Sequence, residues 1–294
     1  MSTWLSAADP SGRAATASSP PSPRPQSLAF ALLGYYVLGH AVAVFTGSYV
    51  DVFQRVGVSE QATRSTLQRM ARRALLRRYR RGQRVYFGLT PRSVAILEDG
   101  RSRVWEVGAV NRGWDGHWTL LGFSMPQSWR RQRHDLRSRL LWGGFGLLHG
   151  GLWIAPSAVD VAGLIGDLGL QAHVKVFVAR AGKETDIGEL IRDAWDLGGL
   201  AARYRSFLER WDRPLPLPGA PDDLARQLWL LTEWLQLVRQ DPRLPVEHLP
   251  EDWPAVRAQQ VFHRLHAAYR AQAQALADEV LDTISVRAAE PDNG

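Results

Sequence analysis

The stretch RMARRALLRRYRRGQRVYF, residues 69–87, holds eight arginines in nineteen positions and no acidic residue. Like charges packed this densely repel one another, so groups of opposite charge are expected to neutralise them. Three interpretations are open at this point: an ordinary solvated face, a strip against a membrane, or the contact surface for a polyanion. Leu75 and Leu76 within the stretch belong to a core under each of them.

The positive charge of the chain, +7 overall, is concentrated around this stretch. Residues 24–113 contain fifteen arginines against five acids, whereas the rest of the chain carries 21 basic and 24 acidic residues. Only Lys175 and Lys183 are lysines, which indicates a general preference for arginine. Such a preference does not explain why residues 61–97 contain no acid. The asymmetry is typical of a module that binds a polyanion.

Composition bounds the class of protein. With 294 residues, 45% of them hydrophobic, the chain is long enough for two or three globular domains. Cysteine is absent, which excludes disulfides, thiolate metal sites and cysteine nucleophiles and fits a cytoplasmic location. Residues 28–50 carry no formal charge and are long enough to span a bilayer, so a membrane-anchored basic protein is one hypothesis. Gly34, Gly39 and Gly47 interrupt that run and argue against membrane contact.

Composition and periodicity predict a multidomain α+β protein with five segments. They are a disordered tail (1–26), a winged helix-turn-helix DNA-binding domain (27–110), a ferredoxin-like central α/β domain (111–183), a helical C-terminal domain (184–285) and a second tail (286–294). The first tail is rich in Ser, Ala and Pro and buries too little apolar surface to order itself.

The DNA-binding segment is predicted from the order of its elements. Helical periodicity runs from Leu28 to about Phe45, a turn follows at Thr46–Ser48, and a short helix ends at Gly57.

Ser59 is then a favourable N-cap for a polar-faced helix whose residues Thr63, Leu67 and Met70 share one face. Two short strands joined around Arg81-Gly82 follow, as in a winged helix-turn-helix.

The central segment alternates strands and helices. WTLLGFSM, GGLWIAPS and HVKVFVAR predict strands, with an amphipathic helix after the first and a short helix at 159–168. The C-terminal segment is expected to be all-helical, with Leu224, Leu228, Leu231, Leu235 and Val238 as a core-facing stripe and a last long helix over 255–283.

In this order the sequence resembles the PaaX family of bacterial repressors, known from phenylacetate degradation operons. Four stretches carry the resemblance: TRSTLQRMARRALL at 63–76, WDGHWTLL at 114–121, LLWGGFGLLHGGLWIAPS at 140–157 and DPRLPVEHLPEDW at 241–253. The resemblance implies a DNA-binding repressor, and a small effector of the aryl-CoA or acyl-CoA thioester type that releases it from DNA.

The residues expected to meet DNA lie on the polar-faced helix and the hairpin. Arg64 and Gln68 are candidates to read base edges, since arginine pairs with guanine and glutamine with adenine through two hydrogen bonds. The full set of candidates is Gln61, Arg64, Ser65, Gln68, Arg69, Arg72, Arg80, Arg81 and Arg84. The hairpin arginines are expected on phosphates or in the minor groove.

A second basic run, residues 130–139, suits the phosphates of a CoA thioester. Its weak candidates are Arg130, Arg131, Arg133 and Arg137, and a solvated or dimer-facing helix surface is the alternative interpretation.

An enzyme is not expected. No G-x-S-x-G, P-loop, dinucleotide fingerprint or H-E-x-x-H pair occurs in the sequence, and no catalytic residue, cofactor or metal site is predicted. The central segment also resembles the small nuclease of CRISPR adaptation modules, so a metal-dependent nuclease or RNA-binding protein is the alternative. That nuclease places an acid near the end of its first strand, and LLGFSMP has none here. A homodimeric repressor on a palindromic operator is therefore the favoured hypothesis.

Overall fold

The computed structural model describes residues 24–105, 109–217 and 219–286. The predicted tails 1–26 and 286–294 lie almost wholly outside these ranges, except that a helix already begins at Pro25. The chain forms two compact units. The central unit contains residues 109–205 and 239–256, and the terminal unit contains the described parts of 19–108, 206–238 and 257–294. Both contain helices and an antiparallel sheet, which confirms the α+β class.

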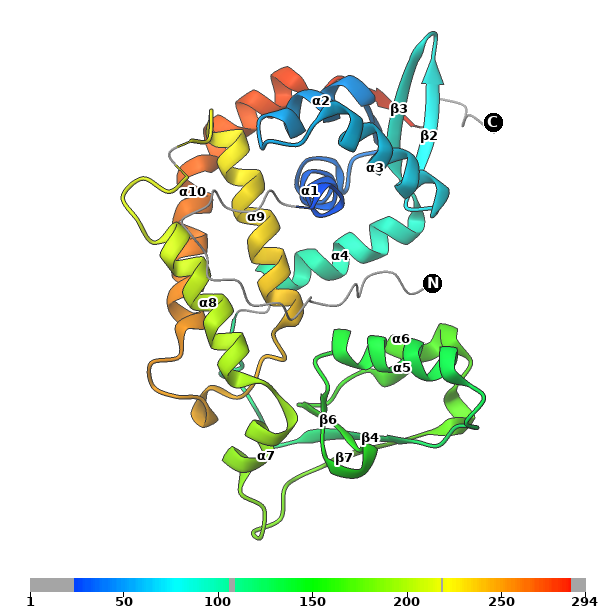
Figure 1. Cartoon of the computed structure of the whole chain (residues 1–294), viewed down its shortest axis with the longest axis vertical. Helices are drawn as coiled ribbons and strands as arrows, with labels where there is room; N and C mark the ends of the chain where they lie inside the picture. The colour runs from blue at the N-terminus through cyan, green and yellow to red at the C-terminus, as the bar shows by residue number, and fades with distance from the viewer. Residues whose placement is uncertain (1–23, 106–108, 218, 287–294) are drawn as a thin grey trace. The chain divides into compact units, whose positions relative to one another are not determined.

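The first part of the terminal unit contains helices, a short strand and a hairpin, and it ends with a helix (Figure 1). Its first elements are α1 (Pro25–Leu32), the π-helical turn η1 (Leu33–Val37), β1 (Val42–Phe45), α2 (Thr46–Gln54), α3 (Glu60–Arg72), β2 (Leu76–Arg81), β3 (Arg84–Leu89) and α4 (Pro91–Trp105). The antiparallel sheet has the order β2-β3-β1-β8.

Two expectations for the start of this unit are wrong. The predicted helix up to Phe45 ends at Val37, because Gly39 adopts a φ of 88° and the following residues extend into β1. The turn expected at Thr46–Ser48 is instead the first turn of α2. Partners distant in sequence fix this geometry: the Thr46 hydroxyl donates to the carbonyl of Val85 at 2.7 Å.

The features predicted for α3 and the hairpin are confirmed. The Ser59 Oγ accepts a hydrogen bond from the amide of Ala62 at 3.3 Å, as an N-cap does. Thr63, Leu67 and Met70 are all buried. The β2–β3 turn has Gly82 at a φ of 60°, a left-handed conformation that glycine adopts without strain.

The C-terminal region is helical except at its end. Its helices are α8 (Leu197–Trp211), α9 (Asp223–Gln240) and α10 (Pro254–Val280), and they contribute residues to both units. On the predicted stripe of α9, Leu235 is half-buried and the other four residues are buried. In the terminal unit Trp234 stacks on Phe262, with ring centroids 4.8 Å apart and planes inclined by 11°.

The expectation of an all-helical C-terminus is wrong for the last described residues. β8 (Thr283–Ser285) pairs antiparallel with β1 and forms an edge of the terminal sheet. Ile284, 6% exposed, packs with Ala43, Tyr79 and Tyr86. The predicted domain boundaries are not tested by these contacts and stay a prediction.

The sheet of the central unit and the two helices between its strands follow the order β4 (Trp118–Phe123), α5 (Arg130–Trp142), β5 (Gly146–Leu147), β6 (Trp153–Pro156), α6 (Val161–Ile165) and β7 (Val174–Ala179). Helix α7 (Ile187–Ala194), the first part of α8 and several short 3-10 helices also belong to this unit. The sheet order is β5-β6-β4-β7, with all neighbours antiparallel. The three predicted strands are present, and β5 is an additional two-residue strand.

Both faces of the central sheet are covered over much of their area. Leu121 and Trp153 pack with Leu136 and Leu140 of α5 on one face, where α5 and α6 lie (Figure 1). On the other face, Trp118 belongs to a cluster with Ile191 of α7 (Ile187–Ala194) and with Leu244.

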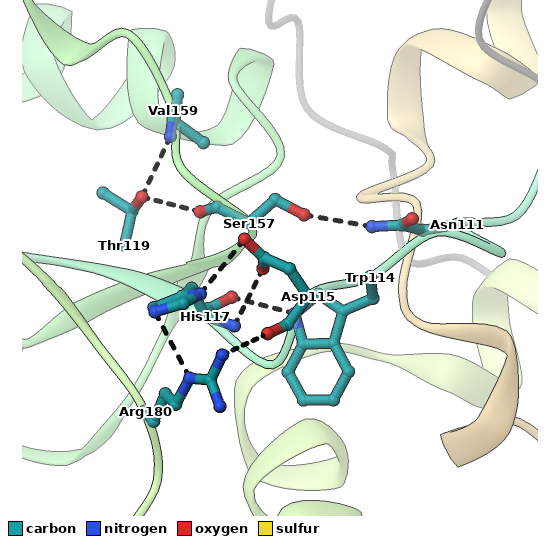
Figure 2. A network of polar contacts seen from close by, with 8 residues as sticks. All are labelled: Asn111, Trp114, Asp115, His117, Thr119, Ser157, Val159 and Arg180. Atoms are coloured by element: carbon teal, nitrogen blue, oxygen red, sulfur yellow. Dashed lines mark hydrogen bonds and ion pairs between the residues drawn. The ribbon is translucent and has the colours of Figure 1, made fainter.

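A network of polar contacts connects the loop before β4 to the neighbouring strands, and Figure 2 shows its eight residues. They come from the loop before β4 and from the ends of β4, β6 and β7: Asn111, Trp114, Asp115, His117, Thr119, Ser157, Val159 and Arg180. Arg180 donates to the Asp115 carbonyl at 3.1 Å and to the His117 Nε2 at 3.3 Å. The WDGHW motif therefore has a structural role: it holds the loop before β4 against the end of β7.

Candidate nucleic-acid interface

Helix α3 divides into a buried and an exposed face. Its buried residues anchor it against α1 and α2, because the apolar side chains recur at helical spacing. Four of the predicted DNA-contacting residues share the opposite, exposed face: Gln61, Arg64, Ser65 and Gln68. Together with Glu60 they line a shallow, open hollow on this face of the helix. The structure thus brings together the residues proposed to read bases.

The two arginines near the end of α3 differ. Arg69 is half-buried, and its NH2 group donates to the Thr66 hydroxyl at 3.1 Å. Arg72 is exposed in the last turn. Positive charge at a helix C-terminus is favourable in itself, because the terminal carbonyls carry partial negative charge. Only Arg72 of these two is therefore fully presented to solvent.

The hairpin places its arginines outward. In β2 the pattern of exposure buries Leu76 and Tyr79 and exposes the intervening Arg77 and Arg78, together with Arg80 and Arg81. The Arg80 Nε donates to the carbonyl of Gly82 at 3.2 Å, which orients that side chain along the turn.

Arg84 has an environment that the sequence does not indicate. Its NH1 group lies 2.8 Å from a carboxylate oxygen of Asp282, and its guanidinium carbon lies 5.1 Å from the ring centroid of Phe45. The positive charge is therefore partly neutralised within the protein. The Tyr86 hydroxyl is 3.4 Å from the same carboxylate oxygen.

Exposed arginines near this surface also include some outside the predicted set. Arg77 on β2 and Arg92 in the first turn of α4 are both exposed, and Arg92 donates to the Arg73 carbonyl at 3.4 Å. A strict two-residue alternation from the apolar Leu76 predicts that Arg77 is exposed, and it misses Arg78, which is exposed as well because Tyr79 is the next buried residue.

Two of the four weak effector candidates on α5 already contact other groups of the protein. Arg133 donates to the carbonyls of Met125 and Pro126 at 3.3 and 3.1 Å, and Arg131 lies 3.9 Å from Asp135 one turn later. Arg130 and Arg137 are exposed. These local contacts explain Arg133 and Arg131 as parts of an ordinary helix surface.

Two other classes of site, metal centres and membrane spans, concern residues 24–105, 109–217 and 219–286. No group of three or more His, Cys, Asp or Glu side chains there is arranged to hold a metal ion. None of the described helices combines the length and apolar character that a membrane span requires.

Comparisons with known proteins agree with this arrangement of elements. Three family models match successive parts of the chain: "PaaX-like protein" at residues 24–93, "PaaX protein central Cas2-like domain" at 111–191 and "PaaX-like protein C-terminal domain" at 195–279. The Transcriptional repressor PaaX of Escherichia coli (strain K12) is 26% identical over 270 residues, which cover 87% of this chain and 84% of that protein.

A solved structure shares the fold. The uncharacterized protein Rv0674 from Mycobacterium tuberculosis superposes with a TM-score of 0.57 at 22% identity, covering 86% of this chain and 98% of that one. The three family models together span most of the sequence, in the order in which its elements occur. The chain belongs to the PaaX family.

Proposed function

We propose that the protein is a transcriptional repressor that binds double-stranded DNA through α3 and the β2–β3 hairpin. The observation that carries the proposal is the exposed polar face of α3 followed directly by a hairpin whose outward side chains are arginines. The order α2, α3, hairpin supports a winged helix-turn-helix, with α3 as the helix that enters the major groove. The E. coli relative, a transcriptional repressor by name, supports the same function.

The roles follow from the placement of each side chain. Gln61, Arg64, Ser65 and Gln68 read base edges in the major groove, where each base pair presents its own pattern of donors and acceptors. Arg72, Arg80 and Arg81 bind phosphates and release counterions. Arg69 and Arg84 contribute less, because the first is held by Thr66 and the second is paired with Asp282.

The central unit is proposed to be ferredoxin-like and to mediate dimerisation. The order of its strands and helices, and the antiparallel sheet order β5-β6-β4-β7, support the first assignment. For the second, β7 is an edge strand with three consecutive exposed apolar residues, Val176, Phe177 and Val178. Such an edge is a template for pairing with another strand. A symmetric dimer matches a palindromic operator.

A small effector of the aryl-CoA or acyl-CoA type is proposed to release the repressor. Its phosphates suit arginine forks, and Arg130, Arg131 and Arg137 of the α5 run are exposed, Arg131 with Asp135 3.9 Å away. The effector acts only if it binds the DNA-free form more tightly than the DNA-bound form. DNA binding of this kind places the protein in the cytoplasm.

Fluorescence anisotropy with labelled duplexes from the gene's own promoter tests the function. We expect affinity that falls steeply as salt rises from 50 to about 200 mM, since phosphate contacts release counterions. Addition of phenylacetyl-CoA as a probe is expected to lower the affinity. An affinity that does not change with salt concentration, or no binding at 50 mM salt, contradicts the proposal. Cleavage of DNA or RNA that EDTA abolishes favours a nuclease instead.

A further inference from the structure

Glu60 lies at the start of α3, among the side chains proposed to read DNA. It is the only acid in residues 60–97, and it lines the same surface hollow as Gln61, Arg64 and Gln68. Its Oε1 atom lies 2.7 Å from the Nε of Arg64, and the two side chains are 53% and 51% exposed. The only acid of this basic segment is thus paired with the foremost candidate for base reading.

A carboxylate in this position weakens attraction to DNA. It repels phosphates, and it neutralises one of the arginines that would otherwise bind them. A negative charge in the first turn of α3 is favourable for the helix, which accounts for an acid at this position but not for its pairing with Arg64. The exposed ion pair itself adds little stability, because pairs one helical turn apart contribute little. The pair is therefore better explained by what it does to the direction of Arg64.

The hydrogen bond from Nε determines which edge of the guanidinium group remains available. Nε is the inner nitrogen, so its bond to Glu60 fixes the guanidinium plane and leaves the terminal nitrogens NH1 and NH2 for another partner. Two parallel donors match the O6 and N7 acceptors that guanine presents in the major groove. A phosphate also accepts two hydrogen bonds from a guanidinium group, but its full negative charge would be repelled by the neighbouring carboxylate of Glu60.

We infer that Glu60 is a specificity-determining residue that holds Arg64 for guanine and disfavours contacts with phosphate. This inference rests on the proposed function, because it needs α3 in the major groove. The inference predicts one feature of the operator, namely that each half-site contains a guanine at the position that Arg64 reads. Without Glu60, the protein binds DNA of arbitrary sequence more tightly and discriminates less.

The test compares four proteins: wild type, Glu60→Gln, Glu60→Asp and the matched control Glu98→Gln. Glu60→Gln removes the charge and keeps the shape, whereas Glu60→Asp keeps the charge and shortens the side chain by one methylene. Glu98 is an exposed acid on α4, so its replacement gives the same change in net charge elsewhere in the terminal unit. Circular dichroism verifies that each variant is folded.

Each protein is used to select from a library of randomised 30-base-pair duplexes. For the wild type we expect a guanine position whose replacement by 7-deazaguanine, which lacks N7, lowers affinity about fivefold or more. Glu60→Gln and Glu60→Asp are both expected to lose most of that discrimination. Glu60→Gln should also bind a fixed duplex of arbitrary sequence several-fold more tightly than Glu98→Gln does.

A double mutant identifies the route of the effect. If Glu60 acts through Arg64, the losses of guanine preference in Glu60→Gln and Arg64→Ala are not additive in the combined variant. If the wild type binds specifically and Glu60→Gln behaves like Glu98→Gln, the inference is wrong and the proposed function still holds. Wild type that shows no salt-dependent binding to any duplex overturns both.

Discussion

The carboxylate of Asp282 accepts a hydrogen bond from the guanidinium group of Arg84 at 2.8 Å, although 198 residues separate the two in sequence. The same residue is held at its backbone: its amide donates to the Ser48 Oγ at 3.0 Å, and its carbonyl accepts from Phe45 at 2.8 Å. The end of α10 is thereby fastened to both α2 and the hairpin, and β8 continues directly from this point. The hairpin arginines consequently depend on residues near the C-terminus for their support.

The substitution Ile284→Ala tests this support. Ile284 is 6% exposed and packs against Tyr79 and Tyr86 of the hairpin. Removing its buried methyl and methylene groups is expected to lower the free energy of unfolding by about 2 kcal/mol, through lost apolar contact and the cavity left behind. Urea denaturation measures the change. Thr283→Ala, an exposed position on the same strand, is the control and should change stability by about 0.5 kcal/mol or less.

The substitutions Arg81→Ala and Gln68→Ala separate two kinds of DNA contact. Arg81→Ala is expected to weaken binding to all duplexes and to lower the slope of log affinity against log salt by about 0.9, because one phosphate contact is lost. Gln68→Ala is expected to leave that slope unchanged and to cost about 1–3 kcal/mol on the preferred base. Anisotropy titrations at several salt concentrations measure both.

Arg101→Ala, an exposed arginine of α4, controls for the loss of one charge away from the hairpin. If Arg81→Ala and Gln68→Ala give the same pattern, the surface is only an electrostatic patch and reads no sequence.

Asp241 is expected to make the protein less stable as the pH rises from 4 to 6. Burial raises the pKa of this carboxyl from 3.8 to about 6, against the hydrogen bonds from the Tyr204 hydroxyl and the Arg243 amide. In this window the folded protein keeps a proton that the unfolded chain has released, so stability decreases with increasing pH. Asp241→Asn should remove this slope in urea denaturation across pH 4 to 7. A slope identical to that of the wild type would refute the assignment.

His266 is expected to act in the opposite direction over nearly the same window. Burial, together with the charges of Arg270 and His263, lowers the pKa of His266 from 6.5 to about 4. Its Nε2 lies 3.0 Å from the Tyr35 hydroxyl, and its ring packs on Trp105 with centroids 4.5 Å apart. The unfolded chain takes up a proton below pH 6.5 that the folded state refuses, so stability is lost as the pH falls towards 4.

His266→Gln should therefore reduce the loss of stability below pH 6.5, with little effect on the slope due to Asp241. The two residues belong to different compact units, and their contributions are expected to add. Thermal unfolding of the single and double variants at pH 4.5 and 7 measures this. Strong non-additivity would show that the two groups are coupled.

Local features of the fold could be predicted from the sequence because their causes are local. Ser59 caps the helix that follows it, and Leu67 and Met70 repeat at helical spacing. The Arg81-Gly82 turn carries its own signal, since glycine adopts the left-handed conformation found there. Strands with distant partners could not be predicted in the same way. Val42–Phe45 looks like the end of an apolar helix until β3 and β8 pair with it.

In the candidate site, too, features with local causes could be predicted and contacts between distant residues could not. Its exposed face on α3 follows from helical spacing, and the Glu60–Arg64 pair is visible in that spacing as well, since four residues separate its members. The neutralisation of Arg84 is different, because no local pattern connects it with Asp282. Helical spacing therefore predicted which residues share the exposed face of α3, whereas no local pattern indicated that the charge of Arg84 is partly neutralised.

The position of β8 has a consequence for the synthesis of the protein. Asp282 follows its partner Ser48 by 234 residues, which a ribosome translating about 5–20 residues per second takes between roughly ten and fifty seconds to add. During that time β1 is an open edge, able to pair with β1 of another nascent chain. A premature stop before residue 283 removes β8 and leaves this side of β1 without its neighbouring strand, in a chain that still carries the hairpin arginines.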